Sequence, residues 1–146
     1  MKRIVLFKYL MMTICMVINL SSCRQMAEQA IGESVEKLDR QCPVGITNVD
    51  RITSAEYVHG TIVIRISENN DVTPETLKEL ESSKDAQKKL LRAFVKNSTV
   101  QNTLGDITGD MEKDANLQYK FVCSFRNTSE TLVYRFSINE MYDLFD

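Results

Sequence analysis

LQYKFVCSFRNTSETLVYRFSI, residues 117–138, decides the fold of this chain. In residues 117–125 every second residue is large and apolar or a cysteine, with Gln, Lys, Val and Ser between them. Residues 132–138 repeat the alternation, and the polar segment 126–130 joins the two runs. A period of two is typical of strands that bury one face. The stretch therefore predicts an antiparallel hairpin with one aromatic, buried face.

A second hairpin is expected upstream, in residues 46–67. Residues 46–58 contain several β-branched residues, and His59-Gly60 supplies a turn. Residues 61–67 alternate clearly, with Ile62, Ile64 and Ile66 on one face. These patterns predict two strands joined by a tight turn.

Helical patterns precede both hairpins. In residues 24–40, Ala27, Ile31, Val35 and Leu38 recur at helical spacing on one face, and Pro43 follows. Thr73-Pro74 is a typical helix start, and we expect one long helix over residues 73–97 with a weak or kinked centre. A short helical turn over residues 98–104 should then stop at Gly105.

The end of the chain carries a capping signature. Ser137 and Glu140 match a capping box, which predicts a short final helix with Met141, Leu144 and Phe145. The predicted order is α-ββ-α-ββ-α. It indicates an α+β fold in which helices pack on one face of an antiparallel sheet of about four strands.

The first 22 residues have the parts of a secretory leader. Lys2, Arg3 and Lys8 are basic, residues 9–20 are almost free of polar groups, and Ser21-Ser22 follow. The apolar run of about 12 residues is shorter than the roughly 20 that a helix needs to cross a bilayer. We therefore expect residues 1–22 to be a removed signal peptide.

Leu20-Ser21-Ser22-Cys23 resembles the lipobox of bacterial lipoproteins. The resemblance covers only the leader. It implies that the Cys23 thiol takes a diacylglyceryl group, that the chain is cut before Cys23, and that the new amino terminus takes an acyl chain such as palmitate. Two or three acyl chains hold a protein on a membrane firmly. We therefore expect a protein of the bacterial cell envelope, lipid-anchored on the outer membrane and facing the periplasm or the cell surface. An ordinary signal peptide that leaves Cys23 as a plain thiol is the alternative.

Residues 23–146 would form a single α+β domain with a short N-terminal tether. The leader holds three of the 18 basic residues and none of the 20 acidic ones, so the mature chain would be clearly acidic. That charge argues against nucleic acid as a partner.

Cys42 and Cys123 are the other cysteines of the mature chain. An exported protein can pair two such cysteines, which makes them a candidate disulfide. Alternatively, Cys123 serves as a small hydrophobic side chain on the aromatic face of its strand. A catalytic thiol is not expected, because no activating base is in view.

Lys84, Lys88, Arg92 and Lys96 recur every four residues, with Lys89 beside them. The later residues of this row, Lys88, Lys89, Arg92 and Lys96, are a candidate face for an anionic partner, although a solvated helix face is the simpler interpretation.

His59 is the only histidine and has no Cys or Asp at ligand spacing, so neither a metal site nor a catalytic site is expected from it. Tyr119, Phe121, Phe125, Tyr134 and Phe136 form an aromatic stripe that either lines a ligand cleft or, more simply, forms the core. No phosphate-binding loop or other cofactor motif is present in the sequence, so we expect no cofactor.

The element order is similar to that of β-lactamase-inhibitor-protein-like domains and of small envelope lipoproteins, an analogy of architecture only. The leading hypothesis is a non-enzymatic envelope protein that binds another envelope protein. Two alternatives stay open: a small-ligand or lipid-binding module with a cleft between helices and sheet, and a hydrolase with residues that no motif reveals. An exposed apolar patch on the sheet would favour the first, a closed apolar cavity the second, and an acidic pair with shifted protonation the third. The oligomeric state is open.

Overall fold

The computed structural model describes residues 23–47, 50–110 and 116–145. The predicted leader, residues 1–22, lies outside them. Contacts divide the chain into residues 1–31 and residues 32–146. The described part of the first unit, residues 23–31, is helical, and this helix ends at residue 41 within the second unit. The second unit contains the sheet and the helices that pack on it.

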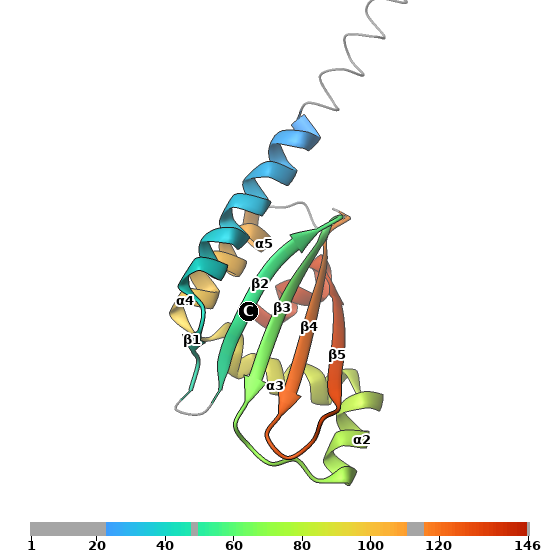
Figure 1. Ribbon diagram of the computed structural model, residues 1–146. Coiled ribbons are helices and arrows are strands. Elements are labelled where there is room, and N and C mark those ends of the chain that lie inside the picture. Colours follow the sequence, from blue (N-terminus) through green and yellow to red (C-terminus); the bar gives the residue numbers. More distant parts are fainter. Residues whose placement is uncertain (1–22, 48–49, 111–115, 146) are drawn as a thin grey trace, which may run out of the picture. The chain divides into compact units, whose positions relative to one another are not determined.

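A five-stranded sheet forms one layer, with helices packed on one of its faces (Figure 1). Its strands follow chain order: β1 (Val44–Gly45), β2 (Arg51–Val58), β3 (Thr61–Glu68), β4 (Gln118–Phe125) and β5 (Thr131–Ser137). The α+β class and both predicted hairpins are confirmed. His59 and Gly60 form the β2–β3 turn with φ angles of 49° and 77°, the left-handed backbone that tight hairpins favour.

We expected an antiparallel sheet of about four strands, but the five-stranded sheet is mixed. β3 and β4 are parallel, with Thr61 opposite Gln118 and Glu68 opposite Phe125. The helices between these strands return the chain to the end of the sheet where β3 begins, so β4 runs in the same direction. Alternation reveals each hairpin but carries no information on how two hairpins join.

Two helices stand where one long helix was expected. α2 (Pro74–Ser82) is capped by Thr73, whose side chain accepts a hydrogen bond from the Thr76 amide, as predicted. α3 (Lys84–Val95) begins anew because the Ser83 side chain accepts from the Ala86 amide at 3.2 Å. The weak centre of the predicted helix is therefore a complete break.

Residues 98–110 are helical throughout, so the predicted stop at Gly105 is wrong. The segment consists of α4 (Ser98–Val100), a π-helical turn (Gln101–Gly105) and α5 (Asp106–Asp110). Three apolar residues, Val100, Leu104 and Ile107, are buried at spacings of four and three. Their packing on both sides of Gly105 stabilises a helical segment that continues past this glycine.

The core lies between the sheet and the helices. The aromatic residues of β4 and β5 are buried, and the Phe121 and Phe136 rings meet edge to face at 5.9 Å. α6 (Ile138–Phe145) closes this face with Met141 and Leu144. Its predicted capping box is confirmed: the Ser137 amide donates to Glu140 Oε2 at 2.8 Å, and the Glu140 amide donates to Ser137 Oγ.

Charged side chains bond to backbone groups on the edge strand β5 and on the part of β2 that the two-residue strand β1 does not pair with. On β2, the Ala55 amide donates to Asp39 Oδ1 from the first helix. On β5, the Lys84 ammonium donates to the Arg135 carbonyl and lies 4.1 Å from the Phe136 ring centroid. These contacts occupy backbone groups through which an edge strand could recruit another chain.

Candidate functional site

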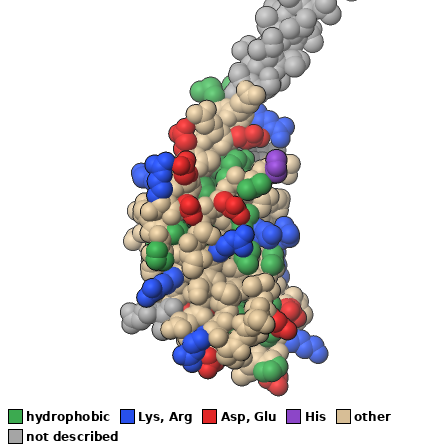
Figure 2. Space-filling view, viewed as in Figure 1, with side chains coloured by type: hydrophobic (Ala, Val, Ile, Leu, Met, Phe, Trp, Pro, Cys, Tyr) green, Lys and Arg blue, Asp and Glu red, His purple; other side chains and the backbone are tan. Residues whose placement is uncertain are grey.

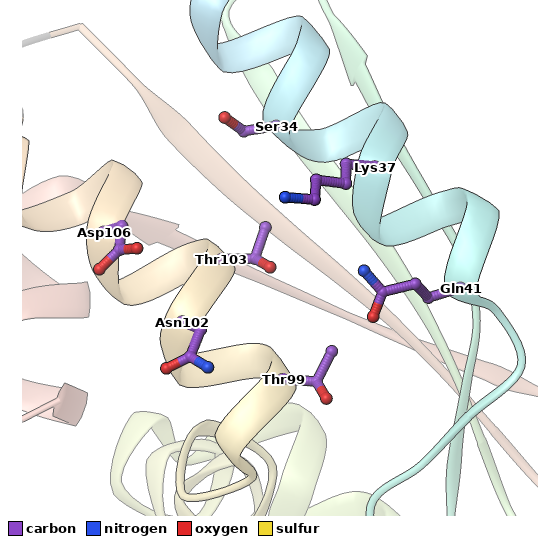
Figure 3. A pocket seen from close by; sticks show the side chains of 7 residues that line it. All are labelled: Ser34, Lys37, Gln41, Thr99, Asn102, Thr103 and Asp106. Atoms are coloured by element: carbon purple, nitrogen blue, oxygen red, sulfur yellow. The ribbon is translucent and has the colours of Figure 1, made fainter.

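A groove of about 360 Å³ lies between the first helix and the helical segment 98–110. The first helix contributes the side chains at positions 34, 37 and 41, whose spacing of three and four puts them on one face. Lys37 and Gln41 extend toward Thr103 and Thr99 on the opposite helix (Figure 3). All the lining residues are polar: Ser34, Lys37, Gln41, Thr99, Asn102, Thr103 and Asp106.

The polar lining is unusual for two neighbouring helices, which ordinarily face each other with apolar side chains. Among the described residues, no hydrogen bond or ion pair engages these seven side chains. Lys37 and Asp106 put one positive and one negative charge around the groove. The groove therefore offers unused donors and acceptors to a polar ligand.

The π-helical turn forms part of the groove wall through Asn102 and Thr103. Single π-helical turns occur often at functional sites, where they re-aim side chains. Sequence reasoning missed this site because it ended the helix at Gly105. The spacing of Val100, Leu104 and Ile107 across that glycine was the available signal.

The basic row of α3 is divided in the structure. Lys84 and Lys88 pair with Glu140 and Asp143 of α6, at 3.3 and 3.6 Å. The sequence places Lys88 on a candidate basic face. In the structure only 22% of its side chain is exposed and it is paired, so it is not part of a free basic surface. Lys89, Arg92 and Lys96 are exposed, at spacings that share one helix face.

Cys42 and Cys123 are free thiols, and the candidate disulfide between them is not formed. Cys42 lies at the end of the first helix, where its thiol donates to the Leu38 carbonyl. Cys123 is fully buried on the core face of β4, and this burial raises its pKa. A buried thiol with a raised pKa is unsuited to nucleophilic attack.

A buried acid lies at the end of β3. Glu68 is 5% exposed, and its pKa is raised to about 7, first by burial and then by the charge of Asp50. Within the described part of the chain, Glu68 Oε1, Asp50 Oδ1 and the Tyr134 hydroxyl are buried without a hydrogen-bond partner. This is the kind of acidic pair that the hydrolase alternative requires. Glu68, however, is covered by the core and is not among the residues that line the groove, so we interpret it as a determinant of stability.

The aromatic stripe of β4 and β5 forms part of the hydrophobic core. Tyr119, Phe121, Phe125, Tyr134 and Phe136 are all buried, and none of them lines the groove. His59 is exposed in the β2–β3 turn.

Cys23, the predicted lipidation site, is exposed. No helix among the described residues is both long and apolar enough to cross a membrane. The described residues also contain no group of three or more His, Cys, Asp or Glu side chains that could hold a metal ion.

No family model matches the chain, and no curated protein matches its sequence. Among solved structures, a Pseudomonas aeruginosa protein thought to be secreted aligns with 76% of this chain and 92% of its own, at 12% identity and a TM-score of 0.43. A likeness at this level carries no argument about function.

Proposed function

We propose that this chain is a lipid-anchored protein of the bacterial cell envelope that acts by binding another envelope protein. Its place in the envelope rests on the lipobox, with Cys23 as the acylated residue and the outer membrane as the expected site. Binding rests on one observation: within residues 32–145 the described helices pack on one face of the sheet, and none of them covers the other face (Figure 1). A sheet face that the chain's own helices leave open is available to a partner.

The anchor is tested by replacing Cys23 with alanine. We expect the full-length variant to leave the membrane fraction and to lose the mass of its acyl chains. Cys42→Ala is the matched control, since it removes a cysteine outside the lipobox, and should fractionate like the wild type. A Cys23→Ala protein that stays in the membrane fraction with unchanged mass would reject the anchor.

The binding function is tested by native mass spectrometry of the full-length protein, extracted gently from its own membranes. A second protein at fixed stoichiometry is the expected result. A chain that carries neither a protein nor a small molecule would contradict any binding function.

The groove supports a second candidate function, the binding of a small polar ligand. The ligand would use the hydroxyls, the amides and the two charges of the lining residues, and not the aromatic stripe that was the alternative ligand cleft in the sequence. In the same experiment, a retained small molecule would favour this function. Thr103→Leu, which fills the groove with an apolar side chain, should then release it, whereas Thr131→Leu on β5 should not.

A further inference from the structure

The side of the sheet opposite the helices carries an unusual set of side chains. Register places Val63, Lys120 and Arg135 in one row across β3, β4 and β5, and Arg65, Val122 and Val133 in the next. We call the side chains that point away from the helices the open face. It comprises residues 51, 54, 56 and 58 of β2; 61, 63, 65 and 67 of β3; 118, 120, 122 and 124 of β4; and 131, 133, 135 and 137 of β5.

The open face is basic, although the chain as a whole is acidic. It holds four basic residues, Arg51, Arg65, Lys120 and Arg135, and one acidic residue, Glu56, which pairs with Arg65 at 3.5 Å. The whole chain has a formal net charge of −2. In Figure 2, drawn from this side, Lys and Arg side chains gather over the middle of the sheet beside hydrophobic ones.

Two like charges oppose each other directly on this face, midway along β4 and the edge strand β5. Lys120 on β4 is paired in register with Arg135 on β5, and neither side chain forms an ion pair with a described residue. Like charges in opposed positions destabilise a sheet. The next pair, Val122 and Val133, is apolar and leaves Val133 46% exposed. Departures from a locally stable arrangement tend to occur at functional sites.

We propose that the open face is the docking surface for a protein whose own surface presents carboxylates around a small apolar centre. This inference rests on the proposed function and deepens it. Arg65 and Arg135 match carboxylates through their planar guanidinium groups, and arginine is enriched at protein interfaces. Val133, which is exposed, and the half-buried Val122 beside it supply the apolar contact.

Other occupants fit this face less well. A second copy would bring one basic face against another, and such like-charge contact opposes association. A membrane surface attracts basic residues but is ordinarily entered by Trp, Phe or Leu. The open face has none of these three.

The test is photo-crosslinking of the full-length lipoprotein in its own cells. The photoreactive residue p-benzoylphenylalanine replaces Val133 on the open face and, in parallel strains, Lys89 on α3 or Thr103 in the groove. We expect a protein adduct from position 133 whose crosslinked peptide is rich in Asp and Glu.

Charge reversal gives the decisive comparison. Lys120→Glu with Arg135→Glu keeps a like-charge pair, so the strain on the fold is matched while the sign is inverted. This variant should reduce the adduct from position 133 by about tenfold or more, since an attractive contact becomes repulsive. Lys89→Glu with Arg92→Glu is the matched control on α3 and should leave the yield unchanged.

Several outcomes would overturn the docking surface: an adduct with a second copy of this chain, an adduct with lipid alone, a contact peptide without acidic residues, or a yield that charge reversal leaves unchanged. A protein adduct found only from position 89 or 103 would reject this surface and leave the proposed function intact. An absence of protein adducts from all three positions would reject both.

Discussion

The two faces of the sheet are built from alternate residues of the same strands, yet they follow different rules. On β4, Tyr119 and Phe121 are buried against helices, whereas Lys120 and Val122, which alternate with them, point to the open side. The buried face pairs aromatic with aromatic, as Phe121 and Phe136 do. The open face sets lysine against arginine. The aromatic contacts stabilise the fold, whereas the pairing of lysine with arginine weakens it. Stability alone therefore does not account for the residues of the open face.

The largest expected difference between the faces is in the free energy of unfolding. Phe121→Ala removes a buried ring and its edge-to-face contact, so it should destabilise the protein by about 3–5 kcal/mol. Val122→Ala, one residue further and on the open face, should change stability by about 1 kcal/mol or less. Urea unfolding measures both. Equal losses at the two positions would mean that the open face is packed against something after all.

The second prediction concerns the acid at the end of the buried face. The pKa of Glu68 is raised to about 7 because burial and the charge of Asp50 disfavour ionisation. Cys123, Tyr134 and, through Tyr134, Glu81 are the other titratable groups that interact around it. In the unfolded chain Glu68 ionises near pH 4.5. Between pH 4.5 and 7 only the folded state retains the proton, so stability should fall as pH rises through this window and level off above it.

The ionisation of Glu68 between pH 4.5 and 7 should lower the free energy of unfolding by about 3 kcal/mol. Glu68→Gln cannot ionise, so it should flatten the pH dependence in this window and be more stable than the wild type at pH 8. Thr131→Ala removes no titratable group and should keep the wild-type slope. Urea unfolding at a series of pH values decides the matter. An unchanged slope in Glu68→Gln would show that another group is responsible.

The third prediction compares two buried tyrosines of the same face. The Thr108 hydroxyl donates to the Leu104 carbonyl at 2.6 Å, so the Tyr119 hydroxyl is the donor in its 2.7 Å bond to Thr108. Burial raises the pKa of Tyr119 to about 12. Among the described residues, no group bonds to the Tyr134 hydroxyl.

Tyr119→Phe should therefore cost about 1 kcal/mol, because a buried hydrogen bond is lost. Tyr134→Phe should be close to neutral or slightly stabilising, because it removes a buried hydroxyl that has no protein partner. Thermal and urea unfolding of the two variants give the comparison directly. A larger loss for Tyr134→Phe would show that its hydroxyl is bonded after all.

The buried face was predictable from sequence because alternation reports burial directly. The aromatic stripe of β4 and β5 and the isoleucines of β3 follow the period of two without interruption. Local caps were also predictable, since Thr73 and Ser137 act on neighbouring backbone groups.

Features that depend on distant packing were not predictable. Glu68 belongs to a polar run that indicates a loop, yet pairing with β4 extends the strand and buries it. The parallel junction of the hairpins and the polar groove likewise bring together segments far apart in sequence. The open face was visible only as the polar half of an alternation, and the opposition of Lys120 to Arg135 required the register.

The opposition of Lys120 to Arg135 gives the smallest expected change in stability, and the most specific one. Lys120→Glu places a carboxylate opposite Arg135, turning a repulsive cross-strand pair into an attractive one. Stability should rise by about 0.5 kcal/mol, an unusual result for a substitution at a wild-type strand position. Gln118→Glu on the same face of β4, opposite Ser137, is the matched control and lacks this directly opposed charge. High salt should shrink the gain, because it screens exposed charges. If Lys120→Glu instead lowers stability and salt has no effect, the two cations do not oppose the fold, and the open face has no conflict that a partner would need to relieve.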